Sequence, residues 1–93
     1  ILAQLQGRYP EAENLYKDSL AIQRKLGNQD GIASSLGQMG LLAEAQGNLA
    51  EAEQFLVQAL EIFQKLGAPD TATVHRALER VRRKKDDGGA TQA

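Results

Sequence analysis

The chain has 93 residues, enough for one domain, and its contents of 42% hydrophobic and 25% charged residues lie near the averages of globular proteins. It contains no cysteine, which excludes disulfide bonds, thiolate nucleophiles and zinc sites with sulfur ligands, and we expect a cytoplasmic location. The formal net charge is −1, and apolar stretches such as Leu41–Ala43 are far too short to cross a membrane.

An internal repeat of 40 residues organises the chain. The segment from Gly7 to Asp30 recurs as Gly47 to Asp70, and ten of the 24 aligned positions are identical, where average composition would give about one or two. A period of this length is typical of stacked supersecondary units, none of which can bury its apolar face alone. With a composition rich in Ala, Leu, Gln and Glu, it predicts an all-α solenoid of antiparallel helix pairs.

Residues 1–29 are predicted to form a partial first repeat. Ile1–Gln6 can supply only the last turns of an earlier helix, and we expect the chain to be a fragment of a larger array. The second helix of this unit begins near Pro10, a favourable residue for a first turn, and ends at Gly27, which can adopt the left-handed conformation of a C-cap.

Residues 30–69 are predicted to form a complete second repeat. Apolar residues spaced three and four apart from Ile32 to Ala43 predict its first helix, with Asp30 as the N-cap. A broad apolar face from Ala52 to Leu66 predicts its second helix, which Gly67 ends.

The end of the chain is predicted to be a capping helix over residues 70–85, followed by a disordered tail over residues 86–93. The charge is uneven, since residues 76–85 carry six basic groups and one acidic group, whereas residues 1–75 carry five basic and nine acidic groups. The tail has the composition of a linker and no apolar anchor.

Residues that could carry chemistry are sparse. His75 is the single histidine, so a multi-histidine metal site is impossible. Glu11 with Glu13, and Glu51 with Glu53, are two residues apart and therefore about 200° apart around a helix axis, which prevents them from acting on one substrate. Their charges instead suit the N-terminal end of a helix dipole. We expect neither an enzyme nor a cofactor.

The spacing of small and large apolar residues resembles the sequence pattern of a known family. The residues concerned are Leu36, Met39, Gly40 and Ala43, then Ala52, Leu56 and Ala59. They fall on the W-x-x-L-G-x-x-Y, A-x-x-x-F and later Ala pattern of tetratricopeptide repeats. Gly40 and Ala52 would be small where the two helices of a pair cross. The period of 40 in place of the usual 34 resembles longer-period members such as kinesin light chains and bacterial regulatory scaffolds.

The resemblance implies a concave groove lined by the first helix of each pair. Carried onto this chain, the groove residues would be Ser34, Gly37, Gln38, Leu41, Glu44 and Ala45, with Gln4 and Leu5 from the truncated first helix. Leu41 is either the apolar anchor for a ligand or a residue buried against the next helix. The helix lacks the Lys, Asn and Arg with which chaperone-binding members clamp a carboxylate, so that specialisation is not expected.

The basic last helix has two interpretations. If Leu78 and Val81 are packing residues, Arg76, Arg80 and Arg83 would face the groove and suit an acidic or phosphorylated peptide. Alternatively, the basic residues only complement the C-terminal dipole and keep a capping helix soluble. Nucleic acid is not expected, because no aromatic residues interleave with the basic run and the rest of the chain is acidic.

The resemblance implies a protein–protein interaction module that binds a peptide or protein segment in its groove, as part of a larger scaffold or regulator. One alternative is a structural spacer that forms homo-oligomers through exposed solenoid ends. Another is the sensory domain of a transcriptional or signalling regulator.

Overall fold

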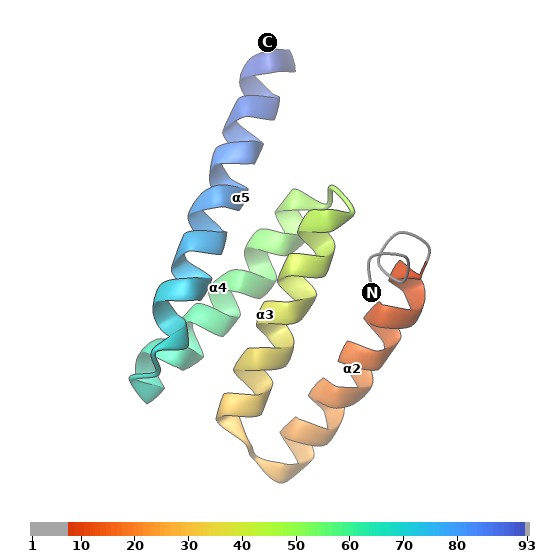
Figure 1. The fold of residues 1–93 in the computed structure, drawn as a ribbon, viewed down its shortest axis with the longest axis vertical. Helices are drawn as coiled ribbons and strands as arrows, with labels where there is room; N and C mark the ends of the chain where they lie inside the picture. The colour runs from red at the N-terminus through yellow and green to blue at the C-terminus, as the bar shows by residue number, and fades with distance from the viewer. Residues whose placement is uncertain (1–7, 93) are drawn as a thin grey trace.

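A computed structural model describes residues 8–92 of the chain, with the side chains of residues 8–87. It contains four helices: α2 (Tyr9–Leu26), α3 (Gln29–Ala45), α4 (Leu49–Leu66) and α5 (Asp70–Gln92). Successive helices run antiparallel and pack side by side, with α3 between α2 and α4 and with α5 against α4 (Figure 1). This arrangement is the predicted all-α solenoid of helix pairs.

Two left-handed glycines end the second helix of each unit in the same way. Gly27 has φ 69° and Gly67 has φ 66°, and the residue after each donates its amide to a carbonyl five residues earlier at 3.0 Å. These Schellman-type bonds satisfy carbonyls that would otherwise lack a partner. The predicted ends at Gly27 and Gly67 are confirmed.

The start of α3 differs from the sequence prediction. The N-cap is Asn28, whose Oδ1 accepts a hydrogen bond from the Gly31 amide at 3.1 Å, and not Asp30. Asp30 lies inside the first turn, where its charge complements the positive end of the helix dipole.

The last helix is longer than the sequence predicts. The backbone of α5 remains helical through Gln92, beyond the helix end predicted at residue 85, and Ala93 lies outside the described residues. Helical hydrogen bonds are local, so a helix can continue beyond its last packed side chain. Figure 1 shows the end of α5 extending past the other helices.

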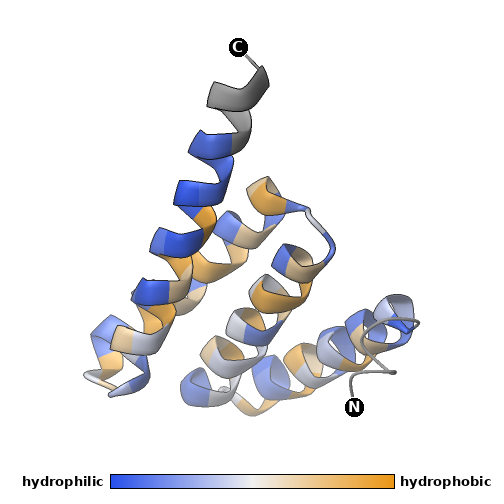
Figure 2. Cartoon of the chain, turned by 45° about the horizontal axis from the view of Figure 1, so that its top comes forward, coloured by the Kyte–Doolittle hydropathy of each residue, from blue (hydrophilic) through white to orange (hydrophobic). Residues whose placement is uncertain are grey.

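The core lies where α3, α4 and α5 meet. Its largest fully buried side chains are Phe63, Leu56 and Val81. Among the residues described, α2 contributes one buried side chain, Leu20, and the partly buried Tyr16. Figure 2 shows apolar residues on the sides of α3, α4 and α5 that face one another, and polar residues on the outer side of α5 below its grey end. The outer side of α5 is therefore exposed and polar over residues 82–87.

Gly40 allows α3 and α4 to approach closely. A Cβ atom placed on Gly40 would lie 2.8 Å from Cγ of Leu56 and 3.3 Å from the carbonyl oxygen of Ala52. Leu56 and Ala52 are fully buried, so neither can move aside easily. The structure confirms the prediction that Gly40 and Ala52 are small because two helices cross there.

Candidate functional site

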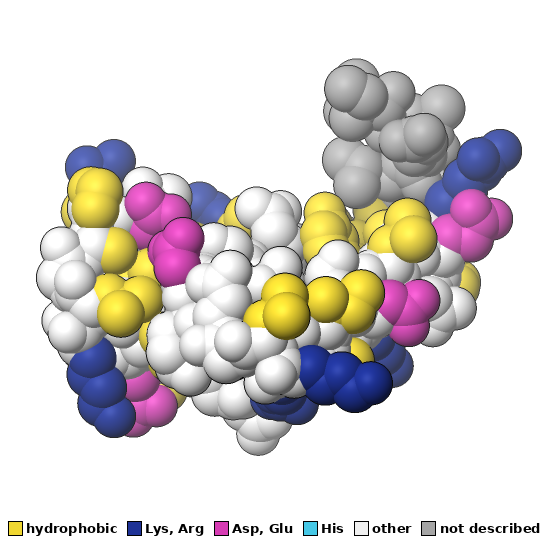
Figure 3. Space-filling view, turned by 90° about the horizontal axis from the view of Figure 1, so that it is seen from below, with side chains coloured by type: hydrophobic (Ala, Val, Ile, Leu, Met, Phe, Trp, Pro, Cys, Tyr) yellow, Lys and Arg dark blue, Asp and Glu magenta, His cyan; other side chains and the backbone are white. Residues whose placement is uncertain are grey.

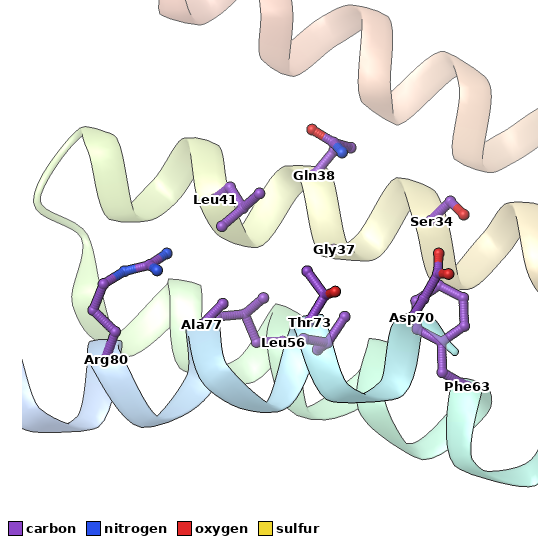
Figure 4. A pocket seen from close by; sticks show the side chains of 11 residues that line it. Ser34, Gly37, Gln38, Leu41, Leu56, Phe63, Asp70, Thr73, Ala77 and Arg80 are labelled. Carbon is purple, nitrogen blue, oxygen red and sulfur yellow. The ribbon is translucent and has the colours of Figure 1, made fainter. Parts of the chain in front are cut away.

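A groove with a volume of about 410 Å³ lies between α3 and α5. Ser34, Gly37, Gln38 and Leu41 of α3 form one wall. The other wall consists of Asp70, Thr73, Val74, Ala77 and Arg80 of α5, and Leu56 and Phe63 of α4 form the floor. Figure 4 shows Arg80 and Asp70 at opposite ends of the row of lining residues.

The groove is apolar in its middle and polar at its ends. Leu41 is 39% exposed and faces the buried Leu56 across the hollow, so its side chain is available to a ligand. Leu41 is therefore not fully buried against the next helix, and its role as an apolar anchor for a ligand stays a prediction.

Arg80 is held at one end of the groove by Glu44. Its Nε and Nη2 atoms donate to the two carboxylate oxygens of Glu44 at 2.7 and 2.8 Å, and Lys84 Nζ donates to the same carboxylate at 2.8 Å. The Glu44 side chain is only 8% exposed. The hydrogen bond from Arg80 lowers the pKa of Glu44 most, and burial, the second-largest effect, raises it. The hydrogen bond from Lys84 and the charges of both basic residues lower it further, so that the pKa is about 2.

A second pair of contacts ties α5 to α4. Arg82 Nε donates to Oε2 of Glu53 at 2.8 Å, and Lys85 Nζ donates to Oε1 at 2.6 Å. These hydrogen bonds, first from Lys85 and then from Arg82, lower the pKa of Glu53. Four of the six basic residues of the 76–85 run are therefore engaged with two acidic residues of the preceding helix pair.

Some of the candidate groove residues predicted from the sequence line the groove, and others do not. Ser34, Gly37, Gln38, Leu41 and Arg80 line the groove together. Glu44 lies beside it through its bond to Arg80. The lining does not include Ala45, Arg76 or Arg83. Gln4 and Leu5 lie outside the described residues.

The position of Arg76 and Arg83 has a simple geometric reason. The sequence prediction assumed that α5 faces the groove with the same side as α3. A groove between two neighbouring helices is instead lined by the sides that face each other. On α5 that side carries Thr73, Ala77 and Arg80 at helical spacing. Helical spacing puts Arg76 and Arg83 on the far side of Arg80 from Ala77.

Arg80 is the one residue of the α5 edge that was predicted from the sequence, and no residue of the α4 floor was predicted. Asp70 and Thr73 were not candidates, although the spacing of Asp70, Thr73, Ala77 and Arg80 on one helix edge was a usable signal. Within the described residues, no group of three or more His, Cys, Asp or Glu side chains could hold a metal ion. No helix in that part of the chain is long and apolar enough to cross a membrane.

Comparisons with known proteins identify the repeat. A sequence model of the tetratricopeptide repeat matches residues 1–65 and again residues 31–88. The crystal structure of the apo form of RapI is similar to this chain with a TM-score of 0.80 and 26% sequence identity, covering 85% of this chain and 29% of RapI. The chain thus spans less than a third of the length of RapI. A comparison with curated proteins gives no significant match.

Repeats of this type form protein–protein interaction modules and are typically without enzymatic activity. The helix pairs, the close crossing at Gly40 and the matched ranges all agree with that architecture. This chain belongs to the tetratricopeptide repeat family.

Proposed function

We propose that the chain binds a peptide or an extended segment of a partner protein in the groove between α3 and α5. The observation that supports this proposal is the partly exposed Leu41 above an apolar floor of Leu56 and Phe63. Ligand-binding hollows are commonly apolar with a few polar groups placed at their edges. The affinity would come from rigid helices that hold these side chains before the ligand arrives.

The groove suits binding better than catalysis. Its hydroxyl side chains, Ser34 and Thr73, could act as nucleophiles only beside a base, and the groove lining contains no histidine to activate them. We infer a non-enzymatic role within a larger cytoplasmic scaffold or regulator. The match covers 29% of RapI, so a segment with this fold can form part of a longer protein.

A displayed library of random 12-residue peptides tests the groove. Selection on the native chain should enrich sequences that are lost on the Leu41→Asp variant, because a carboxylate would then stand in the apolar centre of the groove. Leu26→Asp is the matched control, since Leu26 is 72% exposed on α2 and does not line the groove. Equal enrichment on the native chain and on Leu41→Asp would refute groove binding.

Self-association is a second candidate function, and the outer face of α2 supports it. Leu15, Ile22 and Leu26 lie on one stripe of the helix and are 67%, 56% and 72% exposed. The 40-residue repeat pairs Leu15 and Ile22 with Phe55 and Ile62 of α4, which are partly buried against the core. Figure 3 shows hydrophobic side chains at the surface on the side of the molecule that α2 forms.

The oligomeric state decides this second function. Static light scattering over a concentration series should give a mass that rises towards a dimer for the native chain and stays that of a monomer for a variant with Leu15 and Ile22 both changed to Gln. A strict monomer at every concentration of the native chain would exclude self-association through α2.

A further inference from the structure

The two ends of the groove carry opposite charges, and only the charges at one end form ion pairs within the chain. At one end Arg80 and Lys84 are both bound to Glu44. At the other end Asp70, the first residue of α5, lines the groove, and none of the ion pairs among the described side chains involves it. Ten residues of helix separate Asp70 from Arg80, a rise of about 15 Å.

Glu44 occupies the part of Arg80 that recognises carboxylates best. Arginine binds a carboxylate most strongly through two parallel N–H donors, and Arg80 already uses Nε and Nη2 in this way. An acidic ligand that entered the groove could reach only the remaining Nη1 and Nη2 hydrogens of Arg80, unless it displaced the carboxylate of Glu44, whose side chain is 8% exposed. It would also meet the negative charge of that carboxylate.

Asp70, in contrast, is a carboxylate that can bind a basic side chain of a ligand. Its carboxylate stands at the end of an apolar hollow beside Phe63 and Ser34 (Figure 4). A basic side chain of a ligand can reach it while the apolar part of the ligand covers Leu41 and Leu56. The electrostatic complement of the groove is therefore a basic residue at the Asp70 end.

We infer that the groove selects apolar peptide segments that carry a Lys or Arg at the Asp70 end, and that Glu44 is the specificity residue that prevents recognition of an acidic residue at the Arg80 end. The inference rests on the proposed groove binding and adds the chemistry of its ligand. It replaces the acidic peptide considered from the sequence, because Arg80 is already paired and Arg76 and Arg83 do not line the groove.

The random peptide library tests this inference on four purified chains: native, Asp70→Asn, Glu44→Gln and Glu53→Gln. Glu53→Gln is matched to Glu44→Gln, because each variant loses one carboxylate that holds two basic residues of α5, but Glu53 lies outside the groove. Circular dichroism first establishes that all four chains keep the same helical content at the temperature of selection.

The expected results differ among the four chains. The native chain and Glu53→Gln should enrich peptides with a basic residue next to an apolar core, and should not enrich acidic residues. Asp70→Asn should lose the basic preference and bind the selected peptides about threefold more weakly in fluorescence anisotropy, the loss expected for one ion pair to an exposed carboxylate. Glu44→Gln should acquire acidic residues at the other side of the core, because Arg80 is then free.

Failure of the inference and failure of groove binding give different results. A native chain that enriches acidic residues as strongly as Glu44→Gln, or a basic preference that survives in Asp70→Asn, would overturn the assigned specificity while groove binding stands. Enrichment that is the same on Leu41→Asp as on the native chain would instead refute the groove itself.

Discussion

Arg80 and Glu44 are 36 residues apart in the sequence, yet two nitrogens of the guanidinium donate to the two oxygens of the carboxylate at 2.7 and 2.8 Å. Lys84 adds a third charge-assisted bond to Glu44. This cluster joins α3 to α5 and fixes one end of the groove. It also makes the docking of α5 dependent on charge.

The stability of the chain should depend on pH through Glu44. The pKa of Glu44 is about 2 in the folded chain, against 4.5 for an ordinary glutamate. A lowered pKa means that the cluster stabilises the fold fully above the unfolded value and that this stabilisation disappears as the pH falls from about 4.5 towards 2. Because Arg80 and Lys84 are about half exposed, we expect the loss to be about 1 to 2 kcal/mol.

Urea denaturation at several pH values measures this effect. The difference in the free energy of unfolding between the native chain and Glu44→Gln should be about 1 to 2 kcal/mol at neutral pH and should shrink towards zero near pH 2. A difference that stays constant across this range would show that the Glu44 charge does not stabilise the fold.

Gly40 and Gly37, three residues apart on α3, should respond oppositely to a methyl group. In Gly40→Ala the new Cβ would stand 2.8 Å from Leu56, which is fully buried, and overpacking of this kind costs about 1 to 3 kcal/mol. In Gly37→Ala the nearest atom would be Cβ of Ala59 at 4.0 Å, an ordinary contact. Gly37→Ala should therefore gain about 0.5 to 1 kcal/mol from helix propensity.

Thermal unfolding of the two variants beside the native chain decides between these outcomes. The melting temperature should fall for Gly40→Ala and rise for Gly37→Ala. An equal change in both variants would mean that the crossing of α3 and α4 is looser than the structure shows.

Asn28 and Asn48 occupy equivalent positions before α3 and α4 but should differ in their contribution to stability. The side chain of Asn28 caps its helix through the Gly31 amide at 3.1 Å, whereas Asn48 makes no side-chain cap bond. Asn28→Ala should destabilise the chain by about 1 kcal/mol, and Asn48→Ala should change it little. Equal losses in chemical denaturation would contradict this difference.

Gly67 should not tolerate a side chain, although there is space for one. A Cβ atom on Gly67 would contact nothing within 4 Å, but its φ of 66° is the left-handed region. Gly67→Ala should therefore cost about 1 kcal/mol from backbone strain alone, and Gly67→Asn should cost less, since Asn tolerates this conformation better. If the melting temperature of Gly67→Ala equals that of the native chain, the turn between α4 and α5 has another conformation.

Local features of the sequence determined the helices and their order. The 40-residue repeat, the glycines at 27 and 67, and small residues at 40 and 52 each act within one turn or one helix pair, so their consequences can be read from spacing alone. These signals were enough for the solenoid and for the α3 wall of the groove, from Ser34 to Leu41.

Tertiary structure decided which edges of the helices face each other. Whether Arg76 or Thr73 lines the groove depends on the rotation of α5 against α4, and that rotation follows from the packing of Val74, Leu78 and Val81 and not from any local preference. The pairing of Glu44 with Arg80 likewise needs two helices from different repeats at a set distance. Side-chain contacts between distant segments depend on this geometry, because spacing along the chain fixes only neighbours on the same helix.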